Sequence, residues 1–244
     1  MFYFYKVIDY RIPRHRFSPM ALPPLGGFFY VYMQRVIFYF DGLNYYNGIR
    51  DKAAIDAHWK NYYWLDFVAF CRLFLIEGQH ELIKVRYFTS PPVNQEKRSR
   101  QSALLSANKI LHPGVFQVHS GNHQEKFQNC PFCKKTFAVF EEKRTDVGIA
   151  VQMVLDCLND EVDLLVLVSA DSDQIPALQA IHARFPQKTV KVYFPPERYS
   201  TEIFQLAKPV VFLNENEGKY KKSVMPPAVA GGNKLYTRPP GWKI

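Results

Sequence analysis

The stretch from Val162 to Leu178 constrains the fold of this chain more than any other. The unbroken apolar run 164–168, rich in Leu and Val, is typical of a strand buried on both faces of a parallel sheet. Two carboxylates, Asp171 and Asp173, follow shortly after it, and Pro176 then marks the start of a helix. Because open α/β sheets bind ligands at the carboxyl ends of their strands, we expect both carboxylates at a binding site.

Two neighbouring carboxylates repel each other and are costly unless a cation or a shared proton neutralises them. The plain alternative is a helix cap beside a solvated loop aspartate. Loops at strand ends often carry function, so the D-x-D pattern favours a cation site over that alternative.

The remainder of the chain alternates between strand and helix patterns, which predicts an α/β fold with a parallel sheet and helices on both faces. Residues 45–64 are polar and aromatic and indicate a loop or a broken helix. Apolar or β-rich runs predict further strands at 36–40, 82–88, 115–119, 189–194 and 210–213, and helical patterns occupy 65–76, 94–111, 147–159 and 200–207.

The chain has 244 residues, 48% of them hydrophobic, which suits one domain with extensions. We expect residues 1–32 to be an N-terminal extension outside the fold, residues 33–214 to form the domain, and residues 215–244 to be a basic, Pro- and Gly-rich tail. The two ends carry most of the net charge of +9. A nearly balanced body with basic ends fits an acidic metal site approached by a polyanion, and it fits plain solubility equally well.

Cysteine usage and hydropathy give two further expectations. The four cysteines do not form the framework of a secreted disulfide protein, so we expect a reducing, cytoplasmic compartment. No stretch approaches the roughly 20 apolar residues of a membrane span, so no membrane partner is expected.

Acidic residues recur at two other element boundaries. Asp41 and Asn44 follow the predicted strand 36–40, and Asp146 stands at the start of a predicted helix. Oxygen ligands of this kind suit Mg²⁺ or Mn²⁺, and these cations activate water and neutralise phosphate charge in phosphodiester hydrolysis. Lys143 and Arg144 either hold a phosphate oxygen or form a solvated helix start.

Three segments together resemble the NYN domain family of the PIN-like nuclease superfamily, in a form with a C-x-x-C insertion. They are DGLN at 41–44, EEKRTDVGIA at 141–150 and VSADSDQIPAL at 168–178, within a match from about residue 34 to 213. The resemblance implies a three-layer α/β/α PIN-like (Rossmann-like) sandwich with a central, mainly parallel sheet. It also implies a metal-dependent endoribonuclease that hydrolyses RNA with Mg²⁺ or Mn²⁺. The implied metal ligands are Asp41, Asp146, Asp171 and Asp173, with Asn44 orienting a ligand or water and Ser169 supplying a supporting hydroxyl.

An insertion at about 119–140 carries the second chemical motif. Cys130 and Cys133 supply half of a tetrahedral zinc site, and His119 and His123 are available to complete it. Three interpretations stay open: a zinc knuckle of some kind, a zinc site that uses both histidines, and a β-turn without metal. A thioredoxin-like role is disfavoured because CPFC does not open a helix after a strand.

Two other functional classes remain beside the ribonuclease. One is a non-catalytic RNA-binding or adaptor protein on the same fold, and the other is a different D-x-D phosphohydrolase; a homo-oligomer also stays open. The aromatic residues after the first acid either stack on unpaired RNA bases or pack on the body. These are Tyr45, Tyr46, Trp59, Tyr62, Tyr63 and Trp64.

Overall fold

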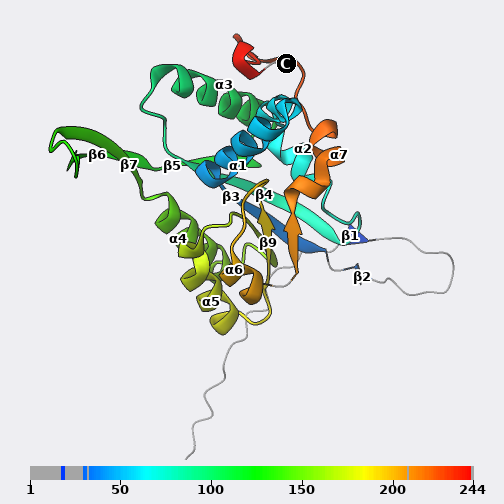
Figure 1. Ribbon diagram of the computed structural model, residues 1–244. Coiled ribbons are helices and arrows are strands. Elements are labelled where there is room, and N and C mark those ends of the chain that lie inside the picture. Colours follow the sequence, from blue (N-terminus) through cyan, green and yellow to red (C-terminus); the bar gives the residue numbers. More distant parts are fainter. Residues whose placement is uncertain (1–17, 20–29, 32, 208, 243–244) are drawn as a thin grey trace, which may run out of the picture.

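The computed structural model describes the chain except residues 1–17, 20–29, 32, 208 and 243–244 (Figure 1). Its centre is a six-stranded, all-parallel sheet in the order β10-β9-β8-β3-β4-β5. The strands are β3 (Gln34–Asp41), β4 (His80–Thr89), β5 (Phe116–Ser120), β8 (Leu164–Val168), β9 (Thr189–Phe194) and β10 (Val210–Phe212).

Helices cover both faces of this sheet, which confirms the predicted three-layer α/β/α architecture (Figure 1). One face carries α1 (Gly42–Ile55), η1 (Ala57–Tyr63), α2 (Phe67–Arg72), α3 (Gln95–Leu111) and α7 (Glu217–Lys222). The other face carries α4 (Thr145–Leu158), α5 (Ile175–Arg184) and α6 (Thr201–Leu206). Short 3₁₀ turns are η2 (Ser172–Gln174), η3 (Leu213–Asn216) and η4 (Pro240–Trp242).

The central strand β3 shows why the core has two halves. Successive side chains of a strand point to opposite faces. Val36, Phe38 and Phe40 accordingly belong to one apolar cluster, and Ile37 and Tyr39 belong to the other. All five are at most 1% exposed, so β3 is buried on both sides.

A buried ion pair ties the second layer of helices to the sheet. Arg86 on β4 donates two hydrogen bonds to Asp156 on α4, at 2.9 and 2.7 Å, and Tyr39 on β3 donates its hydroxyl to the same carboxylate at 2.6 Å. Asp156 is 1% exposed. This network fixes α4 against the strands, and α4 also carries Asp146 in its first turn.

Of the two alternatives for residues 45–64, the broken helix is confirmed and the loop is not, because α1 begins directly after Asp41 and the 3₁₀ helix η1 follows it. The C-terminal segment differs from the sequence expectation. Residues 215–244 are not a tail outside the fold. Tyr220 is fully buried, Trp242 is 6% exposed, and the indole Nε1 of Trp64 donates to the Pro226 carbonyl at 2.8 Å.

Small antiparallel pairs complete the described chain. The pair β11 (Ala228–Gly231) and β12 (Lys234–Thr237) packs on α3, which binds the C-terminal segment to the body. The pair β1 (Ser18–Pro19) and β2 (Tyr30–Val31) falls within the expected N-terminal extension 1–32, most of which lies outside the described residues. The pair β6 (Asn122–Asn129) and β7 (Thr136–Lys143) forms a hairpin that projects away from the body (Figure 1).

Candidate metal centre

The carboxyl ends of β3 and β8 meet at the point where the strand order reverses. β3 pairs with β4 on one side and with β8 on the other, and Phe40 lies opposite Val168 in the last paired register. The chain leaves β3 into α1 on one face and enters β8 from α4 on the other. Such a switch point leaves a crevice beyond the strand ends, where open α/β sheets bind ligands.

Asp41 ends β3 and caps α1. Its Oδ1 accepts the Asn44 backbone N–H at 3.0 Å, and its Oδ2 accepts the Ser169 hydroxyl at 2.9 Å. Gly42 follows because a Cβ there would lie 2.5 Å from the Tyr87 ring and 2.6 Å from the Phe88 carbonyl oxygen. The close approach of α1 to β4 therefore needs glycine after the capping aspartate.

Asn44 and Ser169 join the ends of β3 and β8. The side-chain oxygen of Asn44 accepts the Ala170 backbone N–H at 3.1 Å. The Ser169 hydroxyl, which donates to Asp41, also accepts the Asp171 backbone N–H at 3.0 Å. Ser169 thus has the supporting position expected from sequence, and these bonds hold Asp171 close to Asp41.

Asp146 reaches the same place from the opposite face of the sheet. It lies in the first turn of α4, which begins after Arg144 in a left-handed conformation with φ of 76°. The buried Gln174 donates its side-chain amide to the Asp146 carbonyl at 3.4 Å. This bond connects the start of α4 to the turn that follows Asp171.

Three of the four expected acids form one cluster. One carboxylate oxygen each of Asp41, Asp146 and Asp171 lies within 4.8 Å of the others. They line a cavity of about 230 Å³ together with Asn44. Burial raises the pKa of Asp41 to about 6; the hydrogen bonds from Asn44 and Ser169 oppose this rise, and the charges of Asp146 and Asp171 add to it.

The cluster fits a divalent cation. A hard cation such as Mg²⁺ or Mn²⁺ takes carboxylate oxygens and keeps several waters, which a small open cavity permits. Without a cation, Asp41 is a carboxylate that is 3% exposed and close to two like charges; burial is the main cause of its raised pKa, and the two charges add to it in an unfavourable field. The donor set and the field therefore both suit a bound metal.

Asp173 lies outside the cluster, contrary to the sequence expectation. It sits in the turn η2 with an exposed side chain, and its backbone N–H donates to Asp171 Oδ1 at 3.0 Å. Of the two cations that either hold phosphate or form a solvated helix start, Lys143 ends β7, and Arg144 lines a neighbouring cavity of about 450 Å³. The D-x-D spacing alone did not distinguish Asp171, which caps the turn η2 and joins the cluster, from Asp173, whose side chain is exposed to solvent.

Three further residues line the metal cavity that were not expected from the sequence. They are Leu43, Asn47 and Thr145. Asn47 had a detectable signal, since it follows Asn44 at helical i+3 spacing and therefore lies on the same face of α1.

The histidines and cysteines expected as zinc ligands do not come together as one group of four. His119 lies on β5 and stacks on the Phe88 ring at 4.5 Å, while His123 is at the base of the hairpin opposite Glu142. Cys130 is at the other end of β6, about 20 Å along the strand from His123. The interpretation in which one zinc uses both histidines and both cysteines is therefore wrong for the described conformation.

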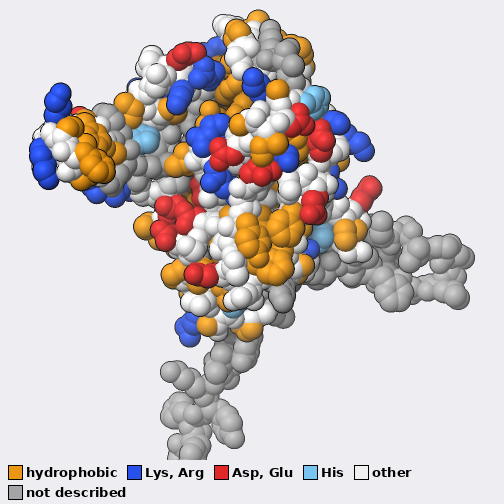
Figure 2. Space-filling view, viewed as in Figure 1, with side chains coloured by type: hydrophobic (Ala, Val, Ile, Leu, Met, Phe, Trp, Pro, Cys, Tyr) orange, Lys and Arg blue, Asp and Glu red, His pale blue; other side chains and the backbone are white. Residues whose placement is uncertain are grey.

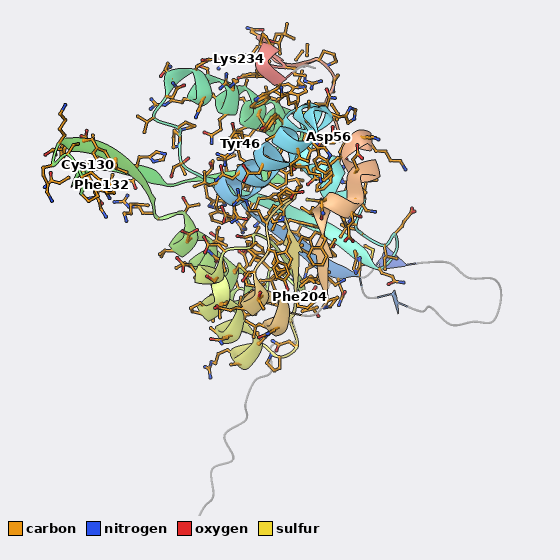
Figure 3. The ribbon with its side chains drawn as sticks, viewed as in Figure 1. Tyr46, Asp56, Cys130, Phe132, Phe204 and Lys234 are labelled. Carbon is orange, nitrogen blue, oxygen red and sulfur yellow. The ribbon has the colours of Figure 1, made fainter. Side chains whose placement is uncertain are left out.

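A larger groove adjoins the metal cavity. It has a volume of about 390 Å³ and shares Leu43 and Asn47 with the metal cavity, and it runs between α1 and α3. Of the aromatic residues predicted to stack or pack, Tyr45, Trp59, Tyr62 and Trp64 are buried in the core. The groove is lined by the rings of Tyr46 and Trp242 and the cations of Arg50, Lys97 and Arg100, among others; Figure 3 labels Tyr46.

In a comparison with protein families, a model of the NYN domain matches residues 35–214. The chain belongs to the NYN domain family. The NYN domain indicates a nuclease-type function, and its carboxylate cluster can hold a metal ion.

Two individual proteins are similar to this NYN domain protein. 6-Hydroxy-3-succinoylpyridine 3-monooxygenase HspA of Pseudomonas putida (strain S16) is 27% identical over 181 residues, covering 61% of this chain and 56% of the relative. The chain thus spans little more than half the length of that curated relative. The crystal structure of VPA0982, a protein of unknown function from Vibrio parahaemolyticus, matches with a TM-score of 0.46 and 20% identity, covering 74% of this chain and 93% of that one.

None of the helices in the part of the chain that the structure describes combines the length and the apolar character of a membrane span.

Proposed function

We propose that this chain is a metal-dependent endoribonuclease that hydrolyses RNA phosphodiester bonds with Mg²⁺ or Mn²⁺. The observation that carries the proposal is the meeting of Asp41, Asp146 and Asp171 within 4.8 Å, at the switch point of an NYN domain. These three carboxylates would hold the cation. When bound, the cation lowers the pKa of water and offsets the negative charge that develops on phosphate oxygens.

The chain's own polar groups complete the site. The Asn44 side-chain oxygen is occupied by the Ala170 N–H, which leaves its amide N–H groups as donors for a phosphate oxygen or a water. Asn47 lines the same cavity one helical turn later. Ser169 holds Asp41 and the Asp171 backbone in place, so the carboxylates are positioned before any ligand arrives.

The groove between α1 and α3 is the proposed path of the RNA strand. Its cations suit the phosphate backbone, and rings such as Tyr46 suit unpaired bases. Trp242 brings the C-terminal segment into this path, and its ring stacks on that of Tyr63 at 5.3 Å. Single-stranded RNA is therefore the proposed substrate class.

The test is cleavage of a labelled single-stranded RNA with Mn²⁺, with and without chelator. Asp171→Asn is expected to lower the rate at least about a hundredfold, since a metal ligand stabilises transition-state charge by several kcal/mol. Asn also caps turns well, so the turn after Asp171 is retained. The matched control is Glu81→Gln, an exposed carboxylate near the amino end of β4, at the opposite edge of the sheet.

Two results would decide against the proposal. Metal-dependent cleavage that persists in purified Asp171→Asn protein would show that the cluster is not the catalytic centre. Tight RNA binding without turnover by the wild-type chain in Mn²⁺ would favour the non-catalytic RNA-binding alternative.

A second candidate follows from the name of the curated relative, a monooxygenase that acts on a succinoylpyridine. The groove of about 390 Å³ has room for an aromatic ring, and its cations suit a carboxylate. Conversion of 6-hydroxy-3-succinoylpyridine by the wild-type chain, supplied with O₂ and a two-electron donor and measured by loss of the compound, would favour this candidate over the ribonuclease.

A further inference from the structure

The end of the β6–β7 hairpin carries two potential metal ligands, Cys130 and Cys133. The proposed nuclease reaction does not use them. The Cys130 N–H donates to the Lys135 carbonyl, and the Lys134 N–H donates to the Cys130 carbonyl, both at 2.9 Å. Lys134 adopts a left-handed conformation with φ of 59°, which closes this tight turn. The Cys130 sulfur accepts backbone N–H groups from Cys133 and Phe132 in this turn. A thiolate is the form that binds metals.

The two cysteines are close to each other and remote from other ligands. Both are free thiols, and they interact through their side chains. Figure 3 places Cys130 and Phe132 at the far end of the projecting hairpin. Within the described residues, the only group of three or more possible ligands is the carboxylate cluster in the body. The hairpin end therefore offers two ligands, whereas a structural zinc site takes four.

We propose that the hairpin ends of two copies of this chain meet and share one zinc ion, held by Cys130 and Cys133 of each copy. A two-fold axis supplies the missing pair of ligands without any further sequence element. Binding displaces four thiol protons to solvent and leaves a centre with four Zn–S bonds. The proposal is independent of the nuclease function.

The charges at the hairpin end fit a shared metal. A zinc ion with four thiolates carries a net charge of −2, and Lys134 and Lys135 of each copy stand beside the ligands to offset it. Without the shared metal centre, the lysines of one copy repel their counterparts on the second copy. The pairing of hairpins is therefore expected only when zinc is bound.

The apolar surface of the hairpin fits a second copy as well. Phe132 is 93% exposed and Phe127 is 70% exposed, although both are large apolar side chains. Figure 2 shows hydrophobic side chains at the end of the hairpin with Lys and Arg side chains around them. Contact between two such ends would remove these rings from water.

The experiment measures zinc content and mass of the full-length chain, purified without a histidine tag and kept reduced. We expect half an equivalent of zinc per chain and a mass in solution of twice 28.5 kDa, falling to 28.5 kDa with a strong chelator. Cobalt substitution should give the absorption spectrum of four thiolate ligands. The double variant Cys130→Ser, Cys133→Ser should bind no zinc and stay monomeric with an unchanged circular dichroism spectrum.

The matched control is His123→Ala, which removes a histidine at the base of the same hairpin and should keep both zinc and dimer. One zinc per monomer, or loss of zinc in His123→Ala, would overturn the proposal in favour of a site within one chain. A dimer that survives both chelator and the double cysteine variant would also overturn it, as would reduced wild-type chain that binds no zinc.

Discussion

Replacement of Asp41 by asparagine should stabilise the metal-free protein, although Asp41 is a central residue of the proposed site. Asp41 is 3% exposed and close to Asp146 and Asp171, and its pKa is raised from 3.8 to about 6. Above pH 6 the folded protein must hold a carboxylate that the unfolded chain ionises more easily. The difference of about two pKa units corresponds to about 3 kcal/mol of lost stability.

The pH dependence follows from the sign of this shift. A carboxyl group whose pKa is raised by folding binds its proton more tightly in the folded state, so its contribution to stability falls as pH rises from about 4 to about 6. Asp41→Asn carries no charge at any of these pH values. Its advantage over wild type should therefore approach 3 kcal/mol above about pH 7 and vanish near pH 4.

The assay is urea unfolding of both proteins with chelator between pH 4 and pH 8. Asparagine retains an oxygen to accept the Asn44 N–H, so the cap of α1 persists in the variant. Addition of Mn²⁺ should reverse the order, because a ligand at a thousand times its Kd stabilises wild type by about 4.1 kcal/mol, which exceeds the advantage of the variant. A metal-free Asp41→Asn protein that is less stable than wild type at pH 7.5, or an advantage that does not shrink towards pH 4, would refute the reasoning.

Four further outcomes are expected. Asp173→Asn should lower RNA cleavage by less than about tenfold, because its side chain is exposed and outside the cluster; a loss equal to that of Asp171→Asn would place it at the metal. Asp156→Ala should cost about 3–5 kcal/mol in denaturant unfolding, because it leaves Arg86 buried without its carboxylate. Tyr46→Ala should weaken binding of single-stranded RNA by about 1–3 kcal/mol in a titration with chelator, and unchanged affinity would remove Tyr46 from the RNA path. Deletion of residues 215–244 should lower unfolding stability by more than about 3 kcal/mol, because it uncovers the core around Tyr220.

The part of the site at the ends of buried strands could be predicted from the sequence, because the order of elements along the chain and the position of each acid after a strand were sufficient evidence. An apolar run followed by an acid marks the carboxyl end of a buried strand, and parallel strands bring such ends to one edge of a sheet. This logic located Asp41 and Asp171, whereas the supporting role of Ser169 was implied by the family resemblance. The prediction that Asp146 belongs to the same cluster required the family resemblance in addition, because the position of an acid at a helix start does not show which strand end it faces.

Other features were decided only by tertiary contacts. Residues 215–244 look like a tail because Lys, Pro and Gly interrupt any helical or strand periodicity of apolar residues. In the structure, however, the rings of Tyr220 and Trp242 pack against aromatic residues far earlier in the chain. Local pattern carries no information about such distant partners. The separation of His123 from Cys130 was likewise decided by the structure, because the extended strand β6 puts these residues, which are close in sequence, at opposite ends of the hairpin.

The sequence by itself therefore determined the layered architecture and most of the acidic cluster, because periodicity and strand ends are local properties. The tertiary structure decided which carboxylate of the D-x-D pair joins the cluster, since that depends on the turn after β8. It also decided that the C-terminal segment lines the groove, because burial of aromatic rings is settled only when distant segments pack together.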